Sequence, residues 1–565
     1  MDFEGVEFVQ VDFVTLNGLE LKVEGGIWNE TTDTSEKDWL QDLNLVCSDG
    51  ADTIKAQPVF TGEKICKKIT IADRKSEFEY RRFACTVSLP RLYDCRVAWE
   101  MAGKRVPWQA FRHGWFSPFS EGVGFGYAIQ SERMIELSAG DLTVRRYSAL
   151  RHACAELRFC ILLLCRFSFA SFTAVVCRTM VMIGRCFKRR PLWLFSDRFN
   201  KADDNGRALF EYVNSLGKDK CAIDSVFAVE STSPDFRDMK RTGRVVNAAG
   251  LAYKIKFLLS DFVISAYHTR AQRMPFSDVG IANMKPLCNN PKFVYLRHGV
   301  SVNDVSKIVG RQFDNARIMI SSAPREYQSV LADDYGYTER EVKLCGLARY
   351  DKLYDDAKGR ITFMPTWRKT IAHRAGAYKF RLSRDFAESR FFLAYRALLT
   401  HPLVVDACRR HHLVMQIMLH PNIVEARRFF ATIPDVEVLP LGESYRKVFA
   451  ESNLLITDYS SVAFDFAYLY KPVLYYQFDQ EEFFGGQYNH GYYDYGKDGF
   501  GEVETDLDAM ATCIAGYVEN GCQMKPEFKK RVDDFFAFTD KNNCKRIYDA
   551  ILEASREESS GAGNA

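Results

Sequence analysis

The sequence predicts an α/β protein in which two consecutive parallel-sheet domains follow a β-rich domain. From Pro191 onward, short apolar runs typical of buried strands alternate with helical patterns, and the alternation restarts after Gly346. Residues 1–145 instead show period-two alternation separated by polar turns. A chain of 565 residues is too long for one core, which agrees with about three folding units.

Composition limits the function classes. Apolar residues make up 47% of the chain and the formal net charge is +3, so we expect a globular protein with no overall attraction to nucleic acid. The 16 cysteines are scattered, without a C-x-x-C pair or zinc-like spacing, and the chain starts without an apolar signal segment. We therefore expect reduced, buried thiols in a cytosolic protein.

The β-rich region, residues 1–145, is predicted to be a sandwich. Asn17-Gly18 is a strong hairpin signal, and apolar and charged residues alternate over 19–24 directly after it. The region carries no catalytic signature, and Arg112-His113-Gly114 is interpreted as an ordinary turn. Further strand-like runs are 69–71, 83–89 and 96–99.

Basic residues dominate residues 146–190, where Glu156 is the only acid. Arginines interrupt the apolar runs before any of them reaches the ~20 residues that a spanning helix needs. We predict amphipathic helices that lie on an anionic membrane surface. The alternative is a pair of core helices that link two domains and point their arginines to solvent.

The two α/β domains are assigned to residues 191–345 and 346–554, and a disordered tail to 555–565. One long helix is expected over about 526–554. The strand candidates of the first domain are 192–195, 257–266 and 292–296, and those of the second are 361–363, 414–419, 454–456 and 473–476.

The stretch from Leu454 to Asp479 is a strand–loop–helix–strand unit with Ser460 and Ser461 at the helix start. Backbone N–H groups and the positive end of the helix dipole meet there, which suits a phosphate. The alternative is that one serine only caps the helix. Lys471-Pro472 is expected to end the helix before the second strand.

Five short segments follow predicted strands in this half of the chain, where open α/β sheets bind their ligands. They supply two histidines, two arginines, two serines and a helix N-terminus, a set that suits an anionic pyrophosphate donor with a base nearby. They suit a metal poorly, and no cofactor is predicted. The segments are Arg297-His298-Gly299, Gly346 to Asp351, Pro365 to Arg368, His420-Pro421-Asn422 and Asp458 to Ser461.

In this order, the segments resemble the CDP-glycerol glycerophosphotransferase family, the polymerases of teichoic acids and capsular polyol phosphates. Asp203-Asp204-Asn205-Gly206 and Tyr495 to Gly501 resemble further family segments, so the resemblance covers about 191–545. It implies a GT-B-like pair of Rossmann-type domains, with the CDP donor held mainly by the second. Four positions depart from the family pattern and leave the polyol open: Arg297, Ser301, Ala348 and Met364.

The resemblance also implies which residues hold the donor: Arg349, Thr366, Arg368, Asp458, Ser460, Ser461 and Asp465. The two serines would bind its phosphates, Arg349 would clamp the pyrophosphate, and Asp465 would reach ribose or polyol hydroxyls. For Arg349 the alternative is a surface pair with Asp351. For Asp465 it is a solvated position on the helix.

His298 is the predicted general base. It would take the proton of the acceptor hydroxyl as that oxygen attacks the β-phosphorus and CMP leaves, a step suited to an imidazole near neutrality. His420 would stabilise charge from the other side of the cleft. His268, which follows another predicted strand, is a second candidate for the base, with a structural role as its alternative.

The sequence therefore predicts a transferase that moves a polyol phosphate, glycerol phosphate before ribitol phosphate, from a CDP carrier to a lipid-linked acceptor. The basic helices would hold it peripherally at the cytoplasmic face of the membrane. A GT-B glycosyltransferase or epimerase that acts on nucleotide sugars is the alternative, because that fold uses similar groups. A non-catalytic membrane scaffold is a third hypothesis, disfavoured by the presence of both histidines.

Overall fold

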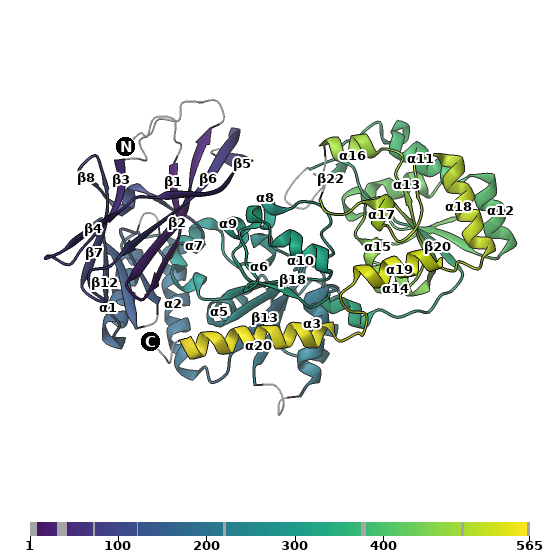
Figure 1. The fold of residues 1–565 in the computed structure, drawn as a ribbon. Helices are drawn as coiled ribbons and strands as arrows, with labels where there is room; N and C mark the ends of the chain where they lie inside the picture. Colours follow the sequence, from purple (N-terminus) through teal and green to yellow (C-terminus); the bar gives the residue numbers. More distant parts are fainter. Residues whose placement is uncertain are drawn as a thin grey trace.

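The computed structural model describes residues 8–30, 42–71, 74–120, 123–130, 132–217, 222–374, 380–486 and 491–561. These residues form a β domain, a helical pair, a first α/β domain and a second α/β domain, which follow one another from left to right in Figure 1. The fold class is the one that the sequence predicts.

The β domain is a sandwich of two sheets, with strand orders β5-β6-β2-β1-β9 and β10-β11-β12-β7-β3-β4. Inward-facing side chains from both sheets, among them Leu21 and Trp99, share one core. Arg112-His113 is not a turn: its backbone pairs with β1 as a short parallel strand, and the His113 side chain is half-buried. The strands are β1 Phe8–Asn17, β2 Glu20–Glu30, β3 Leu43–Ser48, β4 Thr53–Ala56, β5 Val59–Ile71, β6 Arg74–Ser88, β7 Cys95–Met101, β8 Lys104–Val106, β9 Arg112–His113, β10 Phe125–Gln130, β11 Arg133–Ser138 and β12 Asp141–Arg146.

The basic segment forms two helices, α1 (Ala149–Leu164) and α2 (Phe169–Phe187). Their inner stripes pack between the neighbouring domains: Phe159 and Val181 share a core with Tyr127 of β10 and Leu194 of β13 (Leu192–Ser196). Among the described residues, α2 is long and apolar enough to cross a membrane by length and composition, and the bent pair Arg390–Leu399 and Pro402–Arg410 is a second candidate.

One arginine of α2 is buried rather than solvated. Arg178 Nε and Nη2 donate to the two carboxylate oxygens of Glu156 at 2.6 and 2.7 Å, and Nη1 donates to the carbonyls of Asn283 and Lys285 at 3.0 Å each. Removing one partner of such a buried pair costs about 3–5 kcal/mol. The pair therefore locks α1, α2 and the first α/β domain together. The two helices link two domains through a shared core, as the alternative predicts, but its expectation that the arginines point to solvent is wrong for Arg178.

The first α/β domain contains a parallel sheet with the order β15-β14-β13-β16-β17-β18-β19. Successive strands are added on one side of β13 up to β15 and on the other side from β16 onward, so the topological switch point lies between β13 and β16. The predicted strand 257–266 is too long, because residues 257–259 end a helix that buries Tyr253 and Phe257. The other strands are β14 Asp224–Val229, β15 Val245–Asn247, β16 Phe262–Ser265, β17 Lys292–Tyr295, β18 Ala316–Ser321 and β19 Val342–Leu344; the helices are α3 Asn205–Ser215, α4 Asp235–Thr242, α5 Leu251–Leu259, α6 Arg270–Arg273, α7 Asp278–Met284, α8 Ser306–Val309, α9 Arg311–Asp314 and α10 Pro324–Val330.

The second α/β domain repeats the plan with the order β24-β23-β20-β25-β26-β27. Its strands are β20 Arg360–Phe363, β23 Val414–Ile417, β24 Val436–Val438, β25 Ser452–Thr457, β26 Val473–Tyr476 and β27 Val503–Glu504, and a separate hairpin joins β21 Ala372–Arg374 to β22 Phe380–Leu382. Its helices are α11 Arg390–Leu399, α12 Pro402–Arg410, α13 Arg427–Phe430, α14 Tyr445–Glu451, α15 Val462–Ala467, α16 Gln480–Gly486, α17 Tyr495–Asp498, α18 Leu507–Glu519 and α19 Pro526–Phe535.

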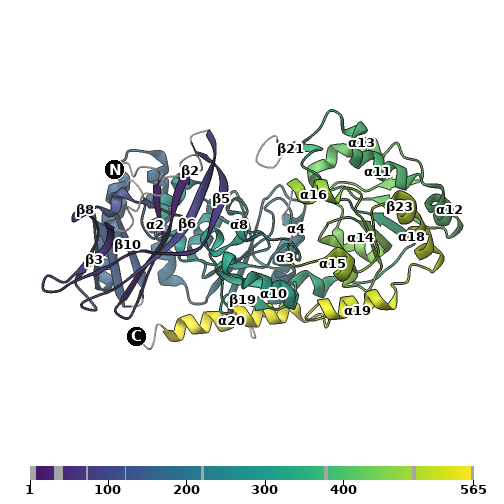
Figure 2. The same cartoon turned by 45° about the horizontal axis from the view of Figure 1, so that its top comes forward.

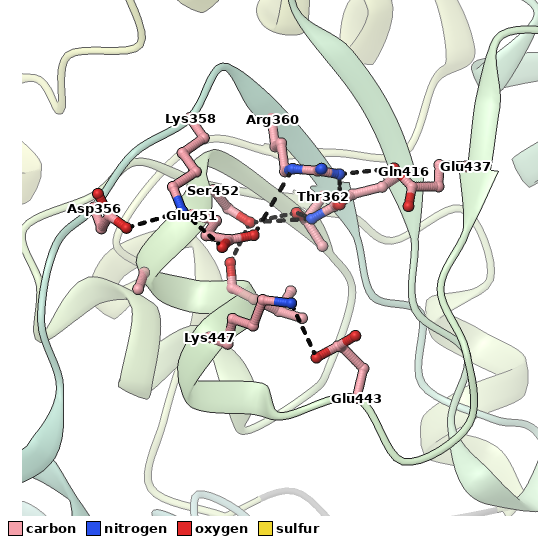
Figure 3. Close-up of polar contacts among 12 residues, drawn as sticks. Asp356, Lys358, Arg360, Thr362, Gln416, Glu437, Glu443, Lys447, Glu451 and Ser452 are labelled. Carbon is pink, nitrogen blue, oxygen red and sulfur yellow. Dashed lines mark hydrogen bonds and ion pairs between the residues drawn. The ribbon is translucent and has the colours of Figure 1, made fainter.

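Polar side chains link neighbouring strands of the second sheet (Figure 3). Arg360 donates to Gln416 and Glu437 at 2.7 Å each, and Gln416 donates to Thr362 at 2.7 Å. None of these side chains is among the residues that line the cleft between the α/β domains, so the network supports the sheet and not a ligand. The polar groups of these side chains find their hydrogen-bond partners within the network.

The C-terminal helix departs from the predicted domain division. The expected helix over 526–554 is two helices, α19 and α20 (Asn543–Gly561), and α20 runs back along the first α/β domain (Figures 1 and 2). Its Ile547 and Ile551 lie in the core of that domain, and Asp351 accepts from the backbone N–H of Asn543 and Cys544 at its start. The helix also extends into the predicted tail, of which 562–565 lie outside the described residues.

All fifteen cysteines in the described part of the chain are free thiols. The expectation that they are buried is wrong for four exposed ones, which lie on strand β5 or on the α1–α2 pair: Cys66, Cys154, Cys165 and Cys186.

Candidate functional site

A cleft of about 980 Å³ lies between the two α/β domains. It is lined by loops that follow β13, β16 and β17 of the first sheet and β20, β23 and β25 of the second, which are the C-terminal edges predicted to carry the site. Seven of the nine predicted site residues line it: His298, Arg349, Thr366, His420, Ser460, Ser461 and Asp465. His268 lines it as well.

The loop after β17 is held by a buried ion pair. Arg297 adopts a left-handed backbone conformation with φ of 59°, and its guanidinium, 1% exposed, contacts Glu326 at 3.1 Å. Glu326 also accepts from the backbone N–H of Ser301 at 2.8 Å. Arg297 therefore supports the loop from behind and leaves the His298 side chain exposed to the cleft.

Several groups surround the His298 imidazole. The Tyr267 ring stacks on it, with centroids 5.3 Å apart and planes 7° apart. The enclosing protein lowers the pKa of His298 to about 4; the charges of Arg349, Arg198 and Arg297 act in the same direction, and Asp204 opposes them. His298 is thus neutral at pH 7 and able to accept a proton.

His420 follows β23 and approaches the cleft from the second domain. Its Nδ1 accepts from the backbone N–H of Asn422 at 3.1 Å, so the neutral ring carries its proton on Nε2 and can donate there. Burial lowers the pKa of His420 to about 4, and the charges of Arg198 and His298 add to that effect. The two histidines therefore share one electrostatic environment, with a proton acceptor on one side and a proton donor on the other.

The serine turn of the second domain meets the His298 loop directly. A Cβ atom placed on Gly299 would lie 2.8 Å from Ser461 Oγ and 3.9 Å from Arg349 Nη2. Val300 and Val302, which follow Gly299, pack in one core with Tyr459 and Phe464 of the second domain. The absence of a side chain at position 299 is what permits this close approach.

Arg349 connects the two domains through carboxylates. Its Nε and Nη2 donate to the two oxygens of Asp465 at 2.6 and 2.8 Å, and Nη1 donates to Asp204 at 2.7 Å. Asp465 is buried, so the alternative of a solvated helix position is wrong. The alternative Arg349–Asp351 surface pair is wrong as well, since Asp351 caps α20.

Two predicted donor-binding residues lie behind the cleft wall. Arg368, 2% exposed, contacts Asp458 at 2.9 Å and Asp479 at 2.8 Å. Asp458 is fully buried and accepts from the backbone and hydroxyl of Thr366. They do not line the cleft, because each is needed to compensate the buried charge of the other. Their role is to hold the Thr366 and Ser460 loops in place.

The structure adds residues that the sequence interpretation did not assign. Asn205 Nδ2 donates to the Arg297 carbonyl at 2.7 Å, and its Oδ1 accepts from the Arg349 N–H at 2.8 Å. The Asp-Asn pair after the first strand of the domain was the available signal for Asp204 and Asn205. Arg198 and Tyr267 belong to no motif, so no sequence signal pointed to them. Within the described residues, no three His, Cys, Asp or Glu side chains gather as metal ligands would.

Comparison with known proteins gives a consistent result. Residues 177–553, about two thirds of the chain, match the family described as CDP-Glycerol:Poly(glycerophosphate) glycerophosphotransferase. The minor teichoic acid biosynthesis protein GgaB of Bacillus subtilis (strain 168) is 34% identical over 385 residues, which are 67% of this chain and 42% of that protein. The teichoic acid poly(glycerol phosphate) polymerase of Bacillus spizizenii (strain ATCC 23059 / NRRL B-14472 / W23) is 33% identical over 137 residues, 24% of this chain and 30% of the polymerase.

Among solved structures, the wall teichoic acid polymerase TagF superposes with a TM-score of 0.51 at 15% identity, over 73% of this chain and all of that one. At this identity the likeness establishes the shared fold, which confirms the GT-B-like prediction. The chain spans less than half the length of the two curated relatives above.

Proposed function

Because the chain belongs to the CDP-glycerol:poly(glycerophosphate) glycerophosphotransferase family, we propose that it transfers glycerol phosphate from CDP-glycerol to an acceptor hydroxyl and releases CMP. The observation that carries the proposal is the approach of the His298 loop to the Ser460–Ser461 turn across one cleft, at Gly299. A neutral base from one domain and phosphate-binding groups from the other thus face the same space.

The residues have distinct tasks in this mechanism. The donor phosphates lie against Ser460 and Ser461, and His298 takes the proton of the attacking hydroxyl. The new bond forms between that oxygen and the β-phosphorus, while the bond from the β-phosphorus to the bridging oxygen breaks and CMP leaves with the electron pair. The Nε2–H of His420 donates to the phosphoryl group or to CMP as charge builds up.

The donor is tested by incubating the protein separately with CDP-glycerol, CDP-ribitol and a UDP-sugar, each with a lipid-linked acceptor, and following nucleotide release by chromatography. CMP release from CDP-glycerol that depends on the acceptor supports the proposal. CMP release from CDP-ribitol but not from CDP-glycerol would identify ribitol phosphate as the transferred group. Turnover of the UDP-sugar without CMP release from either CDP-polyol would overturn the proposal in favour of a glycosyltransferase or epimerase.

Gly299→Ala is expected to reduce CMP release by about 10- to 100-fold. The added methyl would lie 2.8 Å from Ser461 Oγ, so the serine must rotate away from the donor phosphates while the fold is kept. Initial rates and the thermal unfolding temperature are measured together. Gly516→Ala on α18, where an added Cβ meets nothing within 4 Å, is the matched control. A wild-type rate for Gly299→Ala would contradict the proposed contact.

We propose peripheral binding at the cytoplasmic face of the membrane, and the outer face of α1 and α2 supports the membrane contact itself. Phe167 between the helices is 96% exposed, and Phe169 and Phe187 at the two ends of α2 are 85% and 78% exposed. Apolar side chains left in water beside a basic segment suit an anionic lipid surface. The buried stripe that holds α2 on the protein favours a helix lying on the membrane over one that spans it.

Replacing Phe169 and Phe172 with glutamate is expected to weaken binding to anionic vesicles by at least tenfold. Each phenylalanine contributes about 1.5–3 kcal/mol when it leaves water, and the new carboxylates repel the lipid charge. Co-sedimentation with vesicles measures the change. Leu403→Glu, at a 48% exposed position on α12 of the second domain, is the control. Equal sedimentation of both variants would argue against this face.

A further inference from the structure

We propose that Arg198 is a further catalytic residue of this cleft, which binds the non-bridging oxygens of the transferred phosphoryl group from the first-domain side. Tyr267 is its positioning residue and joins it to His298. The inference rests on the proposed function. It assigns a role to Arg198, which belongs to none of the motifs described above.

The guanidinium of Arg198 is anchored at one end and open at the other. Arg198 lies in the loop after β13 and lines the cleft. Its Nε donates to the Tyr267 hydroxyl at 2.7 Å. Among the described residues, Nη1 and Nη2 have no hydrogen-bond or ion-pair partner, yet they are not buried. The fork of donors that suits a phosphate is therefore directed into the open space of the cleft.

Two other arginines of the cleft, Arg349 and Arg207, differ in this respect. Arg349 already uses Nε, Nη1 and Nη2 on Asp204 and Asp465. Arg207 contacts Glu211 at 2.8 Å and also contacts Asp238. Binding a phosphate would require these arginines to give up carboxylates. The charges of Asp204 and Asp203 raise the pKa of Arg198, but among the described residues neither carboxylate is hydrogen-bonded to it. This difference makes Arg198 the better anion-binding group in the structure as it stands.

The position of Arg198 is also the one that the transfer needs. Its guanidinium lies 5.1 Å from the Tyr267 ring centroid, and the same ring stacks on His298. The charge of Arg198 also acts on the pKa of His420 from the opposite domain. A cation of the cleft that stands beside the ring stacked on His298 can reach the non-bridging oxygens of the phosphoryl group under attack.

Arg198 takes no proton in this step and forms no bond. The acceptor oxygen bonds to the β-phosphorus and gives its proton to His298, and the bridging oxygen leaves with CMP. Negative charge on the non-bridging oxygens persists throughout, and a guanidinium fixed by Tyr267 stabilises it without reorganising.

The test compares Arg198→Gln, Arg198→Lys and Arg198→Ala in acceptor-dependent CMP release. Arg198→Gln is expected to lose about 10²-fold in kcat, with a smaller change in KM, and Arg198→Lys to recover part of the loss. Added guanidinium ion is expected to restore part of the Arg198→Ala rate, which a misfolded variant would not show. Arg244→Gln, at an exposed position before β15 that the cleft does not include, is the matched control.

Tyr267→Phe keeps the ring that stacks on His298 and removes only the hydroxyl that anchors Arg198. It is expected to lower kcat in the wild-type background and to have no further effect in Arg198→Gln, because the hydroxyl acts through Arg198. Additive losses, or an Arg198→Gln rate within twofold of the wild type, would overturn the inference while the proposed function stands. Absence of CMP release by the wild-type protein would remove both.

Discussion

Replacing His298 with alanine is expected to reduce CMP release from CDP-glycerol by about 10²- to 10⁴-fold, the range that a positioned general base contributes. The imidazole stacks on Tyr267 and lines the same cleft as the serine turn. Without it, the acceptor hydroxyl loses the imidazole that is proposed to take its proton. Single-turnover rates with saturating donor separate this loss from a change in donor affinity.

His411→Ala, at an exposed position after α12, is the matched control and should retain the wild-type rate. The pH profile gives an independent readout. A base must be unprotonated to act, and because the pKa of His298 is lowered to about 4, kcat/KM should not decline as pH falls from 7 to 5. A decline centred at the ordinary histidine value of about 6.5 would contradict this environment, and full activity of His298→Ala would remove the proposed base.

Arg349→Met is expected to have the largest effect on stability, lowering the free energy of unfolding by about 3–5 kcal/mol. The substitution leaves Asp465, whose side chain is 3% exposed, and Asp204, at 12%, without their cation. Because these carboxylates belong to different domains, the urea transition that reports on the interdomain contact should move most. Circular dichroism and tyrosine fluorescence follow it, with Arg396→Met at an exposed position of α11 as the control.

A combined variant tests whether the unpaired carboxylates cause the loss of stability in Arg349→Met. Adding Asp465→Asn and Asp204→Asn to Arg349→Met removes the unpaired carboxylates, so we expect part of the lost stability to return. Transferase activity should stay low in the combined variant, because the amide groups cannot restore the geometry of the cleft. If the three substitutions destabilise additively, the ion pairs do not connect the domains in the way that the distances indicate.

The strands that carry the site were predictable because their apolar runs are local. The run at 454–456 before the serine turn and the run at 292–296 before His298 each predict a buried strand, and parallel strands bring their following loops to one edge. The histidines and serines of the site therefore follow from position alone. The last helix did not, because the break between α19 and α20 and the return of α20 to the first domain depend on a cap from Asp351, nearly two hundred residues earlier.

The predicted donor-binding set illustrates the same limit. Arg368 and Asp458 belong to segments that also contribute residues to the cleft. Their own side chains are buried outside the cleft, where each compensates the charge of the other. Arg198, in contrast, belongs to no motif and has free donors in the cleft. Spacing along the chain places a residue in a loop, but which face of the loop its side chain takes depends on the partner that packs against it.

The sequence by itself determined the fold class, the two consecutive parallel-sheet domains and the loops that hold the catalytic candidates, because periodicity and strand-end position are properties of neighbouring residues. Only the tertiary structure decided which charged groups of those loops are available to a ligand. Arg349, Arg368 and Arg198 carry the same charge, and they differ in whether a carboxylate from a distant part of the chain already neutralises it. That pairing is a property of the folded interface, so no local pattern encodes it.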